Sequence, residues 1–405
     1  MITCIGVREN TFIRIQYIDV EDINSYNPGK TPWGQRGVLV MLRFKNWLVS
    51  HSSDSHPREL VVEVTNKCNY RCIYCFRNLM EEPEGYMDTG LFHKIIGDAR
   101  ESGVEKIVFT GWGEPLLHPD IKEFAEAVKD NGMSLLLNTN GYFLGDHVEW
   151  VKELVDELYI SLDSSESNLY SVLRKGGDLS RVIEAVERIN RYRRETLSRK
   201  PEITVQFTLT RLNIDNLEST INLAGQLKAT RFIVSNILPL TPGQEKSLAC
   251  YMDPECREKV SRLSTRLARL SMIHNIIISM PQLGLSTERE CPYAARDALY
   301  VRWDGKVTPC IYMAHGWRNT FYGITRTIKP VILGDLREEG LMDIWRSQEF
   351  TRFKFTLDTM HFPSCPDCPL REYCTFTLTN ETDCWGNQPS CASCPYSRDM
   401  VRCPL

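Results

Sequence analysis

The chain has 405 residues, 42% of them hydrophobic, which allows one large domain with appendages or two to three ordinary domains around a real core. Its 48 basic residues nearly balance 52 acidic ones, so the formal charge of -4 favours neither nucleic acid nor anionic lipid as a partner. The start, MITCIGVRENTFIRIQ, lacks the features of a secretory signal, and no stretch approaches the roughly 20 apolar residues that span a bilayer. We therefore expect a cytoplasmic protein without a membrane segment.

Residues 1–57 are expected to form a small β-rich N-terminal appendage. The segments FIRIQYIDV and GVLVMLRF have the composition of short strands, and NPGKTPWGQ interrupts them with turn residues. One use that such strands allow is pairing with a leader peptide.

From about residue 58 to 239, apolar β-rich runs alternate with amphipathic helical patterns, which is typical of βα units around a parallel sheet. We predict an α/β fold with a partial (β/α)6 TIM-like barrel over residues 58–285. Its strands are RELVVEVT (58–65), KIVFTG (106–111), MSLLLNTN (133–140), ELYISLD (157–163), ITVQFTLT (203–210) and RFIVSNILP (231–239). The segment DPECREKVSRLSTRLARLSMIHN is predicted to be a helix after the last strand.

Polar and glycine residues follow the predicted strands. In barrels of this kind the chemistry lies on the loops after the strand carboxyl ends. The first loop carries three cysteines, the second reads GWGEP, the third reads TNG, and the fourth strand ends in SLD. These loops are predicted to form one site at one rim of the barrel.

Fifteen cysteines in a chain without an export signal indicate metal binding rather than disulfides, because cytosolic thiols are kept reduced. Three lie close together near residue 70, and nine lie between residues 291 and 403. The remaining three are expected to be ordinary thiols rather than ligands: Cys4, Cys250 and Cys256.

The first group, CNYRCIYC, offers Cys68, Cys72 and Cys75. An iron-sulfur cubane normally takes four thiolates, so three leave one iron open to chelate another molecule. This spacing, with Tyr74 before the last cysteine, resembles the motif of the radical S-adenosylmethionine (SAM) superfamily, in which the open iron binds SAM. The alternative is a zinc knuckle, but such sites use paired Cys-x-x-Cys units and four ligands, and no fourth ligand lies nearby.

The resemblance extends to the expected SAM pocket. GWGEP is similar to the glycine-glycine-glutamate-proline motif that holds the methionyl amine, although Trp112 departs from it, and glycine there lets backbone approach a ligand. The resemblance implies ribose contacts at the end of the fourth strand and an arginine for the SAM carboxylate. Alternatively, Ser161 and Asp163 could be helix caps, and Arg174 could be a solvated helix residue. The TNG segment could be only a turn. The implied cofactor-binding residues are Tyr74, Gly111, Gly113, Glu114, Pro115, Asn140, Ser161, Asp163, Arg174 and Asn236.

Residues 286–405 resemble the SPASM domain, an appendage of radical SAM enzymes that holds one or two auxiliary iron-sulfur clusters. CPYAARDALYVRWDGKVTPC is similar to its opening. Farther along, Cys384 follows Cys374 after nine residues rather than the usual three. By analogy, Cys291, Cys310 and Cys384 belong to the nearer cluster, and Cys365, Cys368, Cys374 and Cys403 to the farther one. The cluster to which Cys391 and Cys394 belong is left open. The alternative for this region is a structural zinc.

These resemblances imply an enzyme that cleaves SAM reductively to a 5'-deoxyadenosyl radical, which abstracts hydrogen from a substrate. FIVSNILPLT, YVRWDGKVTPC and NETDCWGNQPSCASCPYSRDMVRCP are similar to the tungsten cofactor oxidoreductase maturases. That subgroup implies action on, or for, a tungstopterin oxidoreductase under anaerobic conditions, with an electron donor such as ferredoxin or flavodoxin.

Two other functions stay open on the sequence. One is a peptide- or protein-modifying SPASM enzyme that forms a thioether, a carbon-carbon crosslink or a formylglycine. The other is a non-catalytic iron-sulfur electron carrier, which three clustered thiols disfavour because a carrier has no use for an open iron.

Overall fold

The structure, a computed structural model, describes residues 41–44, 47–50, 52, 54–80, 82–286 and 289–402. Of the predicted N-terminal appendage it contains an antiparallel hairpin of β1 (Met41–Phe44) and β2 (Trp47–Ser50). The predicted strand FIRIQYIDV lies outside the described residues. β1 contacts α11 (Gln348–Asp358), so the hairpin lies beside the C-terminal region.

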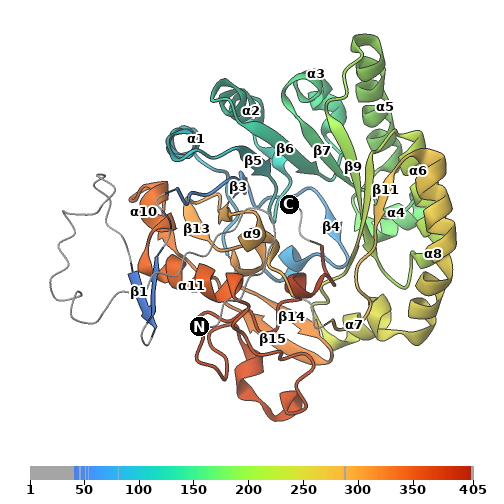
Figure 1. Ribbon diagram of the computed structural model, residues 1–405. Coiled ribbons are helices and arrows are strands. Elements are labelled where there is room, and N and C mark those ends of the chain that lie inside the picture. Colours follow the sequence, from blue (N-terminus) through green and yellow to red (C-terminus); the bar gives the residue numbers. More distant parts are fainter. Residues whose placement is uncertain are drawn as a thin grey trace.

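A ten-stranded sheet forms the centre of the molecule, in the order β11-β10-β9-β7-β6-β5-β3-β12-β13-β16 (Figure 1). All six predicted strands form and pair in parallel with their sequence neighbours, which confirms the α/β fold. They are β3 (Glu59–Val62), β5 (Lys106–Phe109), β6 (Ser134–Thr139), β7 (Glu157–Ser161), β9 (Glu202–Leu209) and β10 (Arg231–Asn236). β11 (Ile277–Ser279) adds a further parallel strand beside β10.

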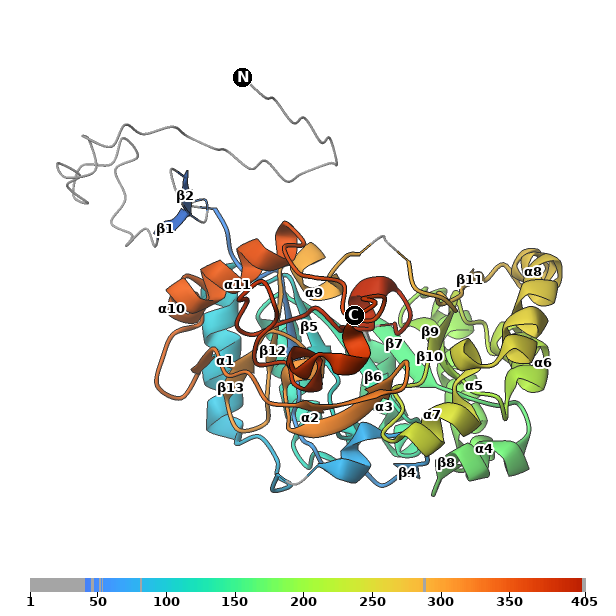
Figure 2. The same cartoon turned by 90° about the horizontal axis from the view of Figure 1, so that it is seen from below.

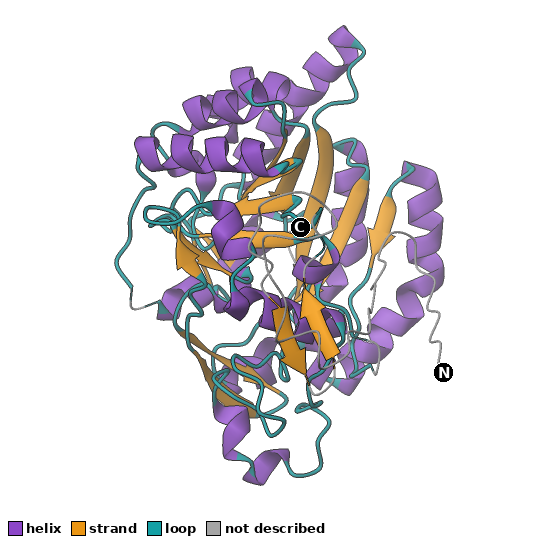
Figure 3. Cartoon of the chain, turned by 60° about the vertical axis from the view of Figure 1, so that its left-hand side comes forward, coloured by secondary structure: helices purple, strands orange, loops and turns teal. Residues whose placement is uncertain are grey.

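Helices cover the outer face of the curved sheet, as the secondary-structure view shows (Figure 3). Their ends follow local rules: Asp88 caps the first one by accepting from Leu91 N, and Gly103, at φ 82°, ends it. The helices are α1 (Thr89–Ser102), α2 (Ile121–Asp130), α3 (Leu144–Leu154), α4 (Ser167–Leu173), α5 (Leu179–Thr196), α6 (Leu217–Gln226), α7 (Pro242–Leu248) and α8 (Pro254–His274). Among the helices described, none has the length and apolar composition to cross a bilayer.

The C-terminal region continues the same sheet. β12 (Ala298–Val301) pairs in parallel with β3, and β13 and β16 follow in antiparallel register, so the sheet runs across the predicted boundary at residue 285. Seen from below, this region lies against the barrel (Figure 2). Its other elements are α9 (Pro292–Ala295), β13 (Lys306–Thr308), β14 (Trp317–Phe321), β15 (Ile324–Ile328), β16 (Gly334–Asp335) and α10 (Leu341–Trp345).

The expectation that Cys250 and Cys256 are ordinary thiols is wrong, because the structure joins them in a disulfide. The turn at Asp253 folds the start of α8 back onto the preceding segment and sets the two Cα atoms 5.2 Å apart, within disulfide range. Spacing in the sequence does not show this approach.

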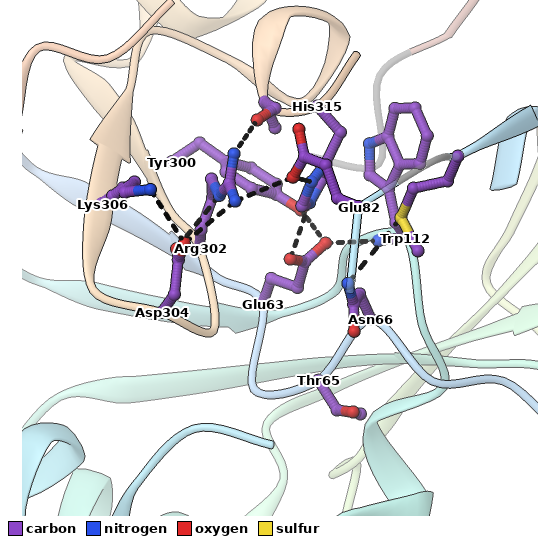
Figure 4. A network of polar contacts seen from close by, with 12 residues as sticks. Glu63, Thr65, Asn66, Glu82, Trp112, Tyr300, Arg302, Asp304, Lys306 and His315 are labelled. Atoms are coloured by element: carbon purple, nitrogen blue, oxygen red, sulfur yellow. Dashed lines mark hydrogen bonds and ion pairs between the residues drawn. The ribbon is translucent and has the colours of Figure 1, made fainter. Parts of the chain in front are cut away.

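A buried polar network joins the barrel to the C-terminal region (Figure 4). Glu63, directly after β3, is completely buried with His315, and Glu63 Oε1 lies 2.9 Å from His315 Nε2. His315 Nδ1 lies 2.7 Å from Glu82 Oε2. The other oxygen of Glu63 accepts hydrogen bonds from Trp112 N at 2.8 Å and from the Tyr300 hydroxyl at 2.7 Å. One carboxylate therefore holds the second strand loop and the C-terminal region together.

These contacts determine the charges of the network. Burial alone would lower the pKa of His315, but Glu63 and Glu82 raise it to about 9. Burial would raise the pKa of Glu82, but His315 and Arg302 lower it to about 2. At neutral pH, His315 is thus an imidazolium between two carboxylates.

We predict that His315→Gln destabilises the protein by about 3–5 kcal/mol, because it leaves the Glu63 carboxylate buried without a cation. The pKa of His315 is raised on folding from its ordinary value to about 9, so its contribution is complete below about pH 6.5 and is lost as the pH rises through 9. The thermal midpoints of wild type and variant should converge between pH 6.5 and 10. A difference that stays constant over this range would contradict the assignment, and His93→Gln, at an exposed histidine, is the control.

Candidate functional site

A cavity of about 260 Å³ lies at the carboxyl ends of the parallel strands. It brings together most of the side chains that the sequence motifs indicated, although they come from separate loops. Those at its wall are Cys68, Cys72, Tyr74, Cys75, Gly111, Gly113, Glu114, Asn140, Ser161, Arg174 and Asn236. The sequence prediction of one site at one rim therefore corresponds to one physical space.

The cysteine loop after β3 is braced by a short strand pair. β4 (Arg71–Cys72) pairs antiparallel with β8 (Arg174–Lys175), which sets Cys72 opposite Arg174. Cys75 N donates to Cys72 O at 3.1 Å and closes a turn between these two ligand candidates. The loop geometry thus comes from backbone hydrogen bonds.

Burial keeps the three thiols protonated in the metal-free protein. It raises the pKa of Cys68 and Cys75 to about 11 and that of Cys72 to about 12. The Cys68 sulfur also accepts from Tyr70 N at 3.4 Å and from Asn140 Nδ2 at 3.8 Å. A cysteine binds a metal as the thiolate. A bound cationic cluster core would therefore have to supply the charge that ionises these thiols.

The donor set fits an iron-sulfur cluster with three protein ligands. The three sulfurs line one cavity, and each thiol influences the ionisation of another. Within the described ranges, no three His, Cys, Asp or Glu side chains, these cysteines included, converge closely enough to hold a single metal ion. A cluster differs from a single ion because its thiolate ligands bind separate irons. The grouping consists of thiols alone, which is the donor type that such clusters use.

Glu114 presents a buried carboxylate beside this loop. Its Oε1 accepts from Thr139 Oγ1 at 2.7 Å and from Leu116 N at 3.1 Å, while Oε2 accepts from Asn140 N at 2.7 Å. Burial raises the pKa of Glu114 to about 6, against these hydrogen bonds. A carboxylate so placed would be stabilised by a cationic group bound in the cavity.

The glycines of GWGEP are needed by the protein itself. A Cβ on Gly113 would lie 2.2 Å from Thr65 O, and one on Gly111 would lie 2.7 Å from Glu63 Cγ. Close approach of the first and second strand loops is therefore a reason for these glycines, and the expected approach of backbone to a ligand stays a prediction.

Trp112, the departure from the usual motif, faces the C-terminal region. Its indole Nε1 donates to Ile311 O at 3.2 Å, and its ring packs on Phe76 with centroids 4.2 Å apart. Trp317 of β14 completes the aromatic group at 5.9 Å from Trp112. The bulky residue therefore joins the GWGEP loop to the segment after Cys310.

Asp163 and Pro115 do not take the places expected for them. Asp163 is fully buried and does not line the cavity, because its carboxylate accepts from Arg174 Nε and from Thr208 N, each at 2.6 Å, and from the Tyr74 hydroxyl. Asp163 orients Arg174 instead of facing a ribose. Pro115 begins a buried 3-10 turn behind Glu114 and lies off the cavity wall.

The motifs did not indicate the C-terminal wall of the cavity. Tyr396, Val401 and Arg402 line it, and Arg402 N donates to Ser235 Oγ at 3.0 Å. Asn236 Nδ2 donates to Met400 O at 2.8 Å and to Gln282 O at 2.9 Å. The only hint in the sequence is that the polar end of the sixth strand needs a covering segment.

The C-terminal cysteines fall into two sets that differ from the sequence assignment. Burial and mutual charge raise the pKa values of one set, which groups Cys291, Cys310, Cys391 and Cys394. Cys365 interacts instead with Cys374 and Cys384, and Cys368 N donates to Cys365 O at 3.3 Å. Cys384 thus lies with the second set rather than with Cys291 and Cys310. Cys403 lies outside the described residues.

Comparison with known proteins agrees with this geometry. The model of the radical SAM superfamily matches residues 62–224, and that of the SPASM iron-sulfur cluster-binding domain matches residues 291–369. The chain is 36% identical over 353 residues to the tungsten-containing aldehyde ferredoxin oxidoreductase cofactor-modifying protein of Pyrococcus furiosus, covering 85% of this chain and 97% of that protein. It is 27% identical over 265 residues to a probable GTP 3',8-cyclase of Methanocaldococcus jannaschii, covering 63% of this chain and 85% of that protein.

Solved structures share the fold. Streptococcus suis SuiB bound to S-adenosylmethionine matches with a TM-score of 0.57 and 18% identity, over 79% of this chain and 72% of that chain. The structure of anSMEcpe with bound AdoMet matches with a TM-score of 0.56 and 17% identity, over 80% and 87% of the two chains.

The two cysteine sets predict which cluster each cysteine-to-alanine variant loses. Cys310→Ala and Cys391→Ala should remove the same cluster, seen as the same missing component in Mössbauer and EPR spectra and a loss of about four irons. Cys384→Ala should leave that component in place. Loss of one common component from Cys310→Ala and Cys384→Ala would restore the sequence assignment and contradict the structural one.

Proposed function

Because the chain belongs to the radical SAM enzymes that carry a SPASM domain, we propose that it modifies a tungstopterin oxidoreductase or its cofactor by radical chemistry. The observation that carries this proposal is the 36% identity across 97% of a protein named for modifying the cofactor of a tungsten-containing aldehyde ferredoxin oxidoreductase. Likeness to SuiB supports only the fold, at 18% identity, so a peptide substrate has no comparable support.

The cavity at the carboxyl ends of the strands supplies the residues for the proposed radical-forming site. Cys68, Cys72 and Cys75 would hold a cluster with one open iron, and SAM would bind beside it. With one electron from an external reductant, this pair would break the carbon-sulfur bond of SAM into methionine and a 5'-deoxyadenosyl radical, which would take a hydrogen atom from the substrate. We assign the auxiliary clusters to the two C-terminal cysteine sets described above.

Two charged residues of the cavity would orient SAM. Glu114, fixed by Thr139 and by Asn140 N, offers a carboxylate to the methionyl ammonium. Arg174, held through Nε by Asp163, lines the cavity and would direct its guanidinium to the methionyl carboxylate. The ion pair with Asp163 fixes the guanidinium before the ligand arrives.

Asn236 would recognise a hydrogen-bond donor at the other end of the cavity. Both of its Nδ2 hydrogens go to backbone carbonyls, whereas Oδ1 is buried without a partner among the described residues. A buried acceptor without a donor is costly, so a bound group with N–H or O–H donors is favoured there. Ile233 of β10 and Val401 of the C-terminal wall would help to keep water from this region.

A reduced partner must deliver the electron, and we propose a ferredoxin or flavodoxin of the cytoplasm for this role. The near balance of charges on the chain, 48 basic against 52 acidic residues, agrees with a protein partner and not with nucleic acid.

The pH dependence of SAM binding tests the role of Glu114. Its pKa is raised to about 6, so the carboxylate that pairs with an ammonium is lost as the pH falls below that value. We predict that anaerobic calorimetry shows SAM affinity weakening by up to about tenfold per pH unit below pH 6. Glu114→Gln should bind SAM weakly and without this dependence, and a variant that kept the same slope would contradict the assignment.

The substrate is tested with the immature tungsten oxidoreductase from the same organism. With SAM and dithionite, wild-type enzyme should form 5'-deoxyadenosine faster when this oxidoreductase or its tungstopterin is present, and mass spectrometry should show a changed cofactor. Cys72→Ala, which removes one ligand of the first cluster, should give neither product while keeping its C-terminal clusters. An unchanged cofactor together with a modified peptide would contradict the proposal.

A further inference from the structure

The hairpin of β14 and β15 carries a buried cation on the face turned toward the cysteines. Asn319 and Arg326 are direct partners in its register. Their exposed fractions are 0% and 1%. Arg326 Nη1 makes long hydrogen bonds to Phe321 O at 3.4 Å and Ile324 O at 3.3 Å. Neither acceptor carries a negative charge.

The remaining polar atoms of Arg326 lack partners. Arg326 Nε and Nη2 are buried without a hydrogen bond to any described residue. An arginine keeps its proton in proteins, so the charge cannot be removed by titration. A buried carboxylate, Glu245, interacts with Arg326 at longer range, but it accepts hydrogen bonds from Tyr322 N and Gly323 N. Because a buried charge without a close counter-charge is unfavourable, a further anion beside Arg326 is favoured.

Cysteines of both sets lie beside this cation, together with Tyr312, and the Glu245 carboxylate acts on it as well. Arg326 lines a small cavity together with Cys365 of one cysteine set and Cys394 of the other. Arg326 and Cys365 influence each other's ionisation, and Tyr312 interacts with both Arg326 and Cys394. The cavity measures about 10 Å³, room for about one water molecule, so a polyatomic anion such as phosphate or sulfate does not fit.

A second buried arginine in the same region, in contrast, has hydrogen-bond partners and a nearby carboxylate. Arg398 also lies near Cys365 and Cys394 and is 1% exposed. It donates to Ser286 O at 3.0 Å and to Ser364 Oγ, and it lies 3.8 Å from Asp367. Proximity to thiols therefore does not by itself leave an arginine unpaired.

We propose that Arg326 is the buried counter-charge of the auxiliary iron-sulfur clusters and raises their reduction potential. The inference rests on the cluster assignment under Proposed function. Thiolate ligands make a cubane anionic, and uptake of one electron makes it more so. A cation in a low-dielectric interior stabilises the reduced form most, so the protein holds its electron acceptor at a higher potential.

The test is a dithionite titration of the intact enzyme followed by EPR, with iron content measured on each variant. Arg326→Gln should lower the equilibrium constant for one-electron reduction of an auxiliary cluster by about tenfold, which equals 59 mV. Arg326→Lys keeps the charge and should stay near wild type. The potential of the cluster whose spectrum responds to SAM is the internal control, and Arg318→Gln, an exposed arginine of the same hairpin, is the matched one.

Each outcome of this experiment either supports or overturns the proposed role of Arg326. A lower auxiliary potential in Arg326→Gln, or loss of iron from it that Arg326→Lys prevents, supports the proposal. Full iron content with unchanged potentials in Arg326→Gln overturns it, as does equal loss of iron from both variants, which would mean that the shape of arginine and not its charge is needed. Zinc instead of iron in the C-terminal region of the wild type would overturn the cluster assignment itself.

Discussion

Burial of three thiols in one cavity is the constraint on which the rest of the structure depends. Burial raises the pKa of each of these thiols, because a thiolate is costly where it is removed from water. A cluster would need the three cysteines as thiolates and would have to supply the charge that stabilises them. The strand pair β4 and β8 holds the loop that presents the sulfurs and places Arg174 opposite Cys72.

The barrel and the C-terminal region act as one unit for a related reason. The shared sheet pairs β3 with β12, and Glu63, directly after β3, pairs with His315. The indole of Trp112, in the loop after β5, donates to Ile311 O in the segment after Cys310. The cavity at the strand ends and the first C-terminal cysteine set are therefore positioned by common contacts. In our proposal Arg326 adds to this connection, since it lies beside cysteines of both sets with two side-chain nitrogens that have no partner among the described residues.

The sequence predicted what local pattern and short motifs determine. The six parallel strands were identified from apolar runs, and the three cysteines, Glu114 and Arg174 were identified from motifs whose loops meet at one rim. Long-range packing could not be predicted in this way. Asp163 is in the expected place along the chain but faces Arg174, because two buried charges satisfy each other.

Other differences between the sequence analysis and the structure have the same origin. The grouping of Cys384 with Cys365 depends on how an irregular C-terminal segment folds, and spacing does not determine that. The disulfide of Cys250 and Cys256 depends on a turn that brings two helical segments together. The covering of Asn236 by Met400 joins residues 164 positions apart, a contact that no local pattern reports.

The vacant iron of the first cluster is the central claim, and pulsed EPR with 15N-labelled SAM tests it most directly. Reduced enzyme loaded with this SAM should show a hyperfine coupling between the methionyl nitrogen and the cluster at the Cys68 loop. A spectrum without any such coupling, and with a fourth protein side chain coordinating that iron, would contradict the account.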